Sequence, residues 1–343
     1  MTNPTWVDDR VRDGRNVDES LGALEGEAST LEVEHPDDAY PARDRALFVR
    51  PAESTGPTYY DLPAIKEPVW IATIPAYFFT GGLAGGSFVF GAAMQLAGPN
   101  DRGARHLVRA CRWIGAGATM VSAGLLVSDL GRPSRFLNML RVFRPTSPMS
   151  VGSWVLATSG AFGAMSLLPG AIGDACAIVA GVLGVPLAGY TAVLVANTAV
   201  PVWQSSRRAL PFLFIAGAIV STSSALDLLS LSRRAENAVR RFGVVGKAME
   251  LFASLAVERE AASRAERVAD PLKSGVSGAL WNAAKVLTAA SLLVAILPGR
   301  SRWKRATAGV LGLVGTAAMR FGVFRAGKSS ARDPRATFEM QRA

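Results

Sequence analysis

Polar side chains interrupt several long apolar stretches of this sequence, and they are the residues best placed to do chemistry. Tyr190 and Asn197 lie seven positions apart in VLGVPLAGYTAVLVANTAVPVWQ, which puts them two turns apart on one face of a helix. In an apolar slot, a hydroxyl and an amide can donate hydrogen bonds to the carbonyl oxygens of a small ligand. They can also bond to neighbouring backbone, so the pattern leaves both interpretations open.

Charged residues within apolar stretches form a second group. Lys247 and Glu250 are three positions apart, and Lys285 lies in a later stretch. Charges at such depth are costly, and they mark either self-neutralising pairs or routes for ions and protons. The spacing favours pairing of Lys247 with Glu250. A proton path through Lys247, Glu250 and Lys285 is the alternative hypothesis.

A basic turn follows the second apolar stretch, and we call residues 130–147 the arginine loop. Its four cations are Arg132, Arg135, Arg141 and Arg144. Asp129 ends the preceding stretch and requires a cationic partner at that depth, for which Arg132 or Arg135 is nearest. Apolar side chains separate the arginines, so the arginine loop can dock a partner protein or rest on lipid headgroups.

Membrane helices must position these residues. Half of the chain, 50%, is hydrophobic, and eight apolar stretches each approach the roughly 20 residues that cross a bilayer. The stretches are 69–97, 113–128, 149–168, 175–202, 209–226, 242–257, 275–297 and 306–319. The sixth is short and charged, and an interfacial amphipathic helix is its alternative interpretation. We expect an all-α integral membrane protein with about eight transmembrane helices in a bundle.

The first apolar stretch carries a pattern for close helix packing. Gly81 and Gly85, and likewise Gly82 and Gly86, have the small-xxx-small spacing that lets another helix approach the backbone. Tyr77 lies near the start of the same stretch, where an aromatic ring is either an interfacial anchor or a ligand contact.

Charge divides the chain into regions. Residues 1–68 hold 15 Asp/Glu against seven Lys/Arg and have no apolar run. We therefore expect a disordered acidic extension over 1–58, a membrane domain over 59–325 and a polar tail over 326–343. The basic residues of the membrane domain fall in loops on opposite faces, which favours anionic lipid and excludes a nucleic-acid site.

Two cysteines and two histidines limit the redox chemistry. An iron–sulfur cluster requires four thiolates, and a haem in a helix bundle requires an inward-facing pair of histidines. Cys111 and Cys176 lie in or beside apolar stretches, as packing residues do. The sequence predicts no metal and no covalently bound cofactor.

From Tyr59 onward the sequence resembles the NrfD/polysulfide-reductase membrane-subunit family. The resemblance is carried by YYDLPAIKEPVWIATIPAYFFTGGLAGGSF, LVSDLGRPSRFLNMLRVFRPTSPMSVGSWVL, YTAVLVANTAVPVW and RFGVFRAGKSSARDP. It implies an eight-helix membrane anchor that exchanges electrons with a diffusible quinone, menaquinone or ubiquinone. A ferredoxin-like iron–sulfur subunit would dock on it, and a molybdopterin catalytic subunit of the formate dehydrogenase or polysulfide reductase type would lie beyond.

The resemblance also implies roles for residues. Tyr190, in the YT motif, becomes a quinone contact, with Asn197 and Tyr77 as further candidates. Polysulfide-reducing relatives have a histidine near the start of the first span, where this chain offers Lys66 and Glu67. Glu67 is either a replacement proton donor or part of a surface ion pair.

The resemblance implies a multi-pass protein of the plasma membrane that is not catalytic alone. The rival function is a membrane transporter or an ion- or proton-conducting protein, in which the intramembrane charges would be working parts.

Overall fold

The structure is a computed structural model, and it describes residues 16–18, 23–25, 64–98, 102–129, 136–299 and 301–342. The chain divides into two compact units, 1–62 and 63–343. In the first, β1 (Asn16–Asp18) pairs antiparallel with β2 (Ala23–Glu25). The predicted disordered extension over 1–58 otherwise lies outside the described residues.

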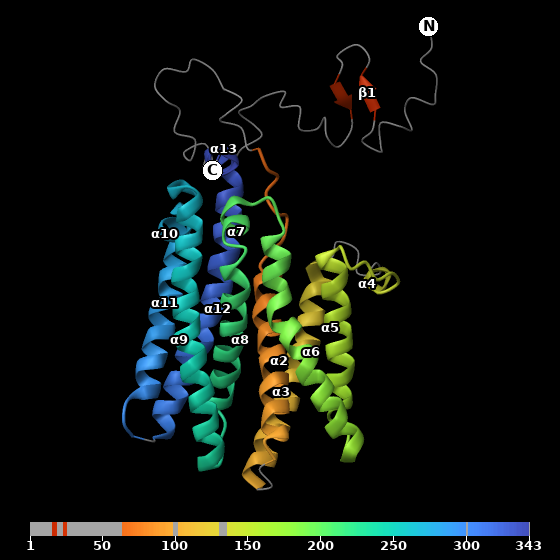
Figure 1. Cartoon of the computed structure of the whole chain (residues 1–343), viewed down its shortest axis with the longest axis vertical. Coiled ribbons are helices and arrows are strands. Elements are labelled where there is room, and N and C mark those ends of the chain that lie inside the picture. Colours follow the sequence, from red (N-terminus) through yellow and green to blue (C-terminus); the bar gives the residue numbers. More distant parts are fainter. Residues whose placement is uncertain are drawn as a thin grey trace. The chain divides into compact units, whose positions relative to one another are not determined.

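Every regular element in the described part of the second unit is a helix (Figure 1). Its long helices are α2 (Thr73–Leu96), α3 (Arg102–Asp129), α5 (Pro148–Met165), α6 (Gly170–Ala196), α8 (Ala209–Asp227), α9 (Arg233–Arg264), α11 (Gly275–Ile296) and α12 (Arg302–Arg332). Its short helices are α4 (Phe136–Met139), α7 (Pro201–Ser205), η5 (Glu266–Ala269), α10 (Asp270–Lys273) and α13 (Pro334–Arg342). Each predicted apolar stretch corresponds to one long helix.

Within the described ranges, six helices are long and apolar enough to cross a membrane: α2, α3, α6, α8, α11 and α12. The remaining two long helices are α5 and α9. The helix α5 is short, with 18 residues, and is rich in glycine and serine. The helix α9 carries Lys247, Glu250 and charged ends. The all-helical membrane class is confirmed, whereas the count of eight spans stays a prediction.

The fourth apolar stretch was predicted as one span over 175–202, and its end is wrong. The helix α6 stops at Ala196, and a separate short helix, α7, begins at Pro201. The residue before a proline is pushed out of the helical region, and Val200 is accordingly extended with ψ 121°. Asn197 is therefore the residue that follows α6 and is not inside it.

The glycine pairs of α2 pack it closely against its neighbours. A Cβ at Gly85 would lie 2.6 Å from the Gly184 carbonyl oxygen of α6, and one at Gly86 would lie 2.5 Å from the Ala218 carbonyl oxygen of α8. The predicted close packing is confirmed at Gly85 and Gly86, whereas a Cβ at Gly81 or Gly82 would make only ordinary contacts, at 3.7 Å and 3.6 Å. The helix α2 thereby joins α3, α5 and α6 to the group α8, α9, α11 and α12 (Figure 1).

Replacing Gly86 with Ala is expected to destabilise the protein by about 1–3 kcal/mol, because the backbone of α8 must move to admit a methyl group. Gly117→Ala is the matched control, since a Cβ at Gly117 meets nothing within 4 Å. Thermal unfolding in detergent measures both. Equal stability of the two variants would contradict the proposed close contact of α2 with α8.

Candidate functional site

Tyr190 belongs to α6, and its side chain packs against α5. Its ring covers Gly152, where a Cβ would lie 2.3 Å from Tyr190 Cε2. Its hydroxyl is buried and has no hydrogen-bond partner among the residues that the structure describes. Buried polar groups in proteins are nearly always hydrogen-bonded, so this hydroxyl is free to bond to a ligand or water.

The indole nitrogen of Trp154 is a second buried donor that lacks a described partner. Trp154 is two residues from Gly152 on α5, and its ring lies edge-on to Phe143 at 6.3 Å. Residues two apart on a helix point about 200° apart, so Trp154 and the surface that receives Tyr190 face different directions. Sequence reasoning missed Trp154, because an indole at the start of an apolar helix is typical of a membrane anchor.

Asn197 and Tyr190 do not share one buried slot. Asn197 is exposed just beyond the end of α6, whereas the Tyr190 side chain is half-buried within it. Tyr77 is only 5% exposed and belongs to the same apolar cluster that Tyr190 packs against. Tyr190 and Tyr77 are thus each packed in the apolar core, whereas Asn197 lies at the surface.

Glu67 ties the segment before α2 to the end of α12. Its carboxylate accepts a hydrogen bond from Arg332 Nε at 2.6 Å and lies 3.3 Å from Lys328 Nζ. Of the two interpretations left open by the sequence, this geometry favours the ion pair. Nearby, Trp70 stacks on Trp203 with ring centroids 6.2 Å apart.

Asp129 binds the start of α2. Its Oδ1 accepts hydrogen bonds from Ile71 N at 3.2 Å and Thr73 Oγ1 at 3.0 Å. A helix N-terminus stabilises a negative charge, so the start of α2 stabilises the Asp129 carboxylate. The sequence predicts an arginine in this role. The predicted partners Arg132 and Arg135 lie outside the described residues.

The described part of the arginine loop exposes cations beside apolar side chains. Arg141 and Arg144 are exposed, with Val142 51% and Phe143 55% exposed between them. The Ser150 hydroxyl accepts from Arg144 N at 3.0 Å and donates to the Val142 carbonyl at 3.2 Å, which fixes the backbone.

Three charged side chains are buried between α8, α9, α11 and α12: Lys247, Glu250 and Arg320, each at most 1% exposed. Glu250 accepts hydrogen bonds from Thr288 of α11 at 3.1 Å and from Thr316 of α12 at 3.3 Å. Within the described residues, no direct ion pair joins Lys247 to Glu250. Lys247 and Glu250 interact electrostatically without direct contact, and the Glu250 carboxylate is held by hydroxyl groups of α11 and α12.

Arg320 was missed in the sequence, where it only marked the end of an apolar stretch. Its Nη2 donates to the Phe214 carbonyl at 2.7 Å, and its guanidinium lies 3.8 Å from the centroid of the Phe214 ring. A Cβ at Gly217 would lie 2.6 Å from Arg320 Nη2 and 2.9 Å from Glu250 Oε1. Gly217 therefore leaves room for both the Arg320 guanidinium and the Glu250 carboxylate.

Lys285 does not join this group. Its Nζ pairs with Glu258 Oε1 at 2.5 Å, and Trp281 Nε1 donates to the same oxygen at 2.5 Å. Glu258 lies eight residues beyond Glu250 on α9, about 12 Å along the helix axis. Lys285 therefore belongs to a separate ion pair between α9 and α11.

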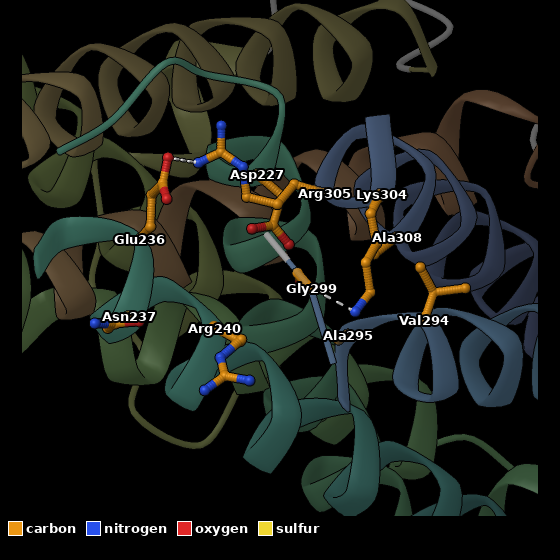
Figure 2. Close-up of a pocket in the computed structure, with 10 residues that line it drawn as sticks. All are labelled: Asp227, Glu236, Asn237, Arg240, Val294, Ala295, Gly299, Lys304, Arg305 and Ala308. Carbon is orange, nitrogen blue, oxygen red and sulfur yellow. Dashed lines mark hydrogen bonds and ion pairs between the residues drawn. The ribbon is translucent and has the colours of Figure 1, made fainter. Parts of the chain in front are cut away.

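A pocket opens where α8 and α11 end and α9 and α12 begin (Figure 2). Its lining includes Asp227, Glu236, Arg240, Lys304 and Arg305. Arg305 donates to Glu236, and Lys304 is held by carbonyl oxygens that include that of Gly299 (Figure 2). These contacts satisfy Arg305 and Lys304, two of the cations that line the pocket.

The helical bundle and its six candidate spans define a multi-pass membrane protein. A family model described as polysulphide reductase, NrfD, matches residues 63–330, which is most of the chain. The chain belongs to the NrfD family, as its motifs predicted. Members of this family are membrane subunits of quinone-linked oxidoreductase complexes and typically pair with iron–sulfur and molybdopterin subunits. A comparison with curated proteins found no match.

Proposed function

We propose that this chain is the quinone-reactive membrane subunit of an oxidoreductase complex in the plasma membrane. It passes electrons between the quinone pool, menaquinone or ubiquinone, and an iron–sulfur partner of a formate dehydrogenase-like or polysulfide reductase-like molybdopterin enzyme. The observation that carries the proposal is the buried Tyr190 hydroxyl, which has no partner among the described residues. Family membership favours this function over the rival transporter.

The chain would cross the membrane eight times, with α5 and α9 as the further spans. With 18 residues, α5 is about 27 Å long, close to the thickness of a bilayer core. The charges of α9 at Lys247 and Glu250 are buried against other helices, which is where charges are tolerated in a membrane.

The quinone candidates lie toward the same end of the bundle as the arginine loop. Asp129, just before the arginine loop, binds the start of α2, which also carries Tyr77. The end of α6 leads through α7 to Trp203, which stacks on Trp70. An iron–sulfur partner docked on the arginine loop would therefore sit at the quinone end of the protein.

Tyr190→Phe tests the quinone contact, because it removes one hydroxyl and keeps the ring. Losing a hydrogen bond of about 0.5–1.5 kcal/mol is expected to weaken quinone affinity roughly threefold to tenfold. Turnover of the whole complex with quinone should fall, while electron transfer to a soluble dye persists. Loss of both activities would instead assign Tyr190 to assembly. If neither activity changes, the quinone binds elsewhere, and Tyr77→Phe tests the next candidate contact.

Reversing charge in Arg141→Glu/Arg144→Glu is expected to lower the yield of the assembled complex and to make assembly more salt-sensitive, because repulsion slows association. Arg105→Glu/Arg109→Glu is the control, since these two exposed arginines lie near the start of α3, at the opposite end of that helix from Asp129. Co-purification of the iron–sulfur subunit measures the effect. Equal yields from both double variants would leave the arginine loop as a lipid contact.

A further inference from the structure

We propose that the pocket where α8 and α11 end and α9 and α12 begin binds one anionic phospholipid with a hydroxylated headgroup, such as phosphatidylglycerol. We call it the lipid pocket. Arg240 would bind the phosphodiester, and Asp227 would accept hydrogen bonds from the headgroup hydroxyls. The lipid pocket belongs to helices other than α5 and α6, and its lipid is independent of the proposed quinone contact at Tyr190.

The lipid pocket lies at the depth of lipid headgroups. Two candidate spans end there, α8 at Asp227 and α11 at Ile296, and a third, α12, begins there. Trp303, at the start of α12, is 83% exposed, and an exposed indole at the end of a span is typical of the membrane–water interface. A headgroup can therefore enter the lipid pocket while its acyl chains stay in the bilayer.

Three polar side chains of the lipid pocket have no direct hydrogen-bond or ion-pair partner among the described residues: Asp227, Asn237 and Arg240. Figure 2 shows Arg240 set apart from the bonded pair of Glu236 and Arg305. A carboxylate only accepts hydrogen bonds and a guanidinium only donates them. A ligand that satisfies both must therefore carry an anionic group and a hydrogen-bond donor.

Charge selects among the headgroups. The lining includes three cations and two carboxylates: Arg240, Lys304 and Arg305 against Asp227 and Glu236. One positive charge is left over, and a phosphodiester with one negative charge balances it, whereas a zwitterionic lipid does not. The Asp227 carboxylate repels a second negative charge on the ligand but accepts hydrogen bonds from a glycerol headgroup. These features favour phosphatidylglycerol over phosphatidylethanolamine.

The first turn of α12 adds to this preference. It carries Arg302, Lys304 and Arg305 and no acidic residue. The N-terminus of a helix attracts anions and repels cations, so this turn lacks the acidic residue that would suit the helix dipole. A phosphate in the lipid pocket would supply the missing negative charge.

The remaining wall of the lipid pocket is apolar, with Val294 and Ala295 of α11 and Ala308 of α12. Beside it on α11, Leu293 is 59% and Ile296 51% exposed, as side chains that face lipid are. An acyl chain can thus continue from the headgroup along α11 into the bilayer, whereas a soluble phosphate ester would leave this wall uncovered.

Titration of the full purified chain in detergent with dioctanoylphosphatidylglycerol, followed by native mass spectrometry, tests the proposal. We expect saturable binding of one lipid, tighter than that of dioctanoylphosphatidylethanolamine. Arg240→Glu is expected to weaken phosphatidylglycerol binding roughly tenfold, because a carboxylate then repels the phosphate. Arg240 is exposed, so the change leaves the packing of α9 intact. Arg241→Glu is the matched control, since it makes the same change in net charge at an exposed neighbour outside the pocket lining.

Glycerophosphoglycerol, which is the same headgroup without acyl chains, separates a lipid site from a site for a soluble phosphate ester. We expect it to bind far more weakly than the lipid, and equal affinity would overturn the proposal. Equal affinity for the two lipids, or equal weakening in Arg240→Glu and Arg241→Glu, would reduce the effect to unspecific charge attraction and would also overturn it. None of these results affects the test of Tyr190.

Discussion

Arg320→Leu is expected to destabilise the protein by about 3–5 kcal/mol, because it leaves Glu250 buried with reduced compensation. Glu250 is 0% exposed, and Arg320 is the cation that α12 contributes beside it. The free energy of unfolding in mixed micelles measures the loss. Arg325→Leu is the control, since Arg325 is exposed on the same helix.

The double variant Glu250→Gln/Arg320→Met sharpens this test. It removes one negative and one positive charge together, so Asp227 and Lys247 still balance each other. Removing two opposite buried charges together costs far less than removing one of them, and the double variant should recover most of the lost stability. A double variant as unstable as Arg320→Leu would show that the two groups are not energetically coupled.

Gly327→Ala is expected to cost about 3 kcal/mol, which is large for one methyl group. A Cβ at Gly327 would lie 1.9 Å from Trp203 Cζ2, within the ring of a side chain that is only 1% exposed. Moving this indole breaks its hydrogen bond to the Val323 carbonyl, 2.8 Å long, and its stacking on Trp70. Overpacking of a filled core therefore adds to lost contacts.

The physical cause is checked by a double-mutant cycle with Trp203→Ala. That variant alone should cost about 3–5 kcal/mol, because a large buried ring is lost. If the methyl group at position 327 acts by displacing Trp203, the combined variant should be less destabilised than the sum of the single variants. Additive effects would mean that Gly327 matters for another reason.

Hydropathy predicted the number and order of the long helices but not their ends. The helices α9 and α12 continue through charged turns, to Arg264 and Arg332, because alanine and arginine are good helix formers even where hydropathy falls. Conversely, α6 ends early at Ala196, because Pro201 forces the preceding residue out of the helical region. The length of an apolar stretch therefore indicates the membrane-spanning segment better than it indicates where the helix begins and ends.

Partners distant in sequence could not be predicted from spacing. Glu67 meets Arg332, 265 positions away, and Asp129 binds Thr73, 56 positions away. Local reasoning instead sought a partner among the nearest arginines for Asp129. Arg320 escaped notice for a related reason, since a charge at the edge of an apolar stretch is indistinguishable in sequence from one that lies in the interface.

The most direct test of the central claim is equilibrium binding of a short-chain quinone to the purified chain in detergent, followed by quenching of tryptophan fluorescence. The account predicts saturable binding to the native protein and binding threefold to tenfold weaker in Tyr190→Phe, with both proteins equally stable. Absence of saturable binding to the folded native protein would contradict the claim that this chain holds the quinone site.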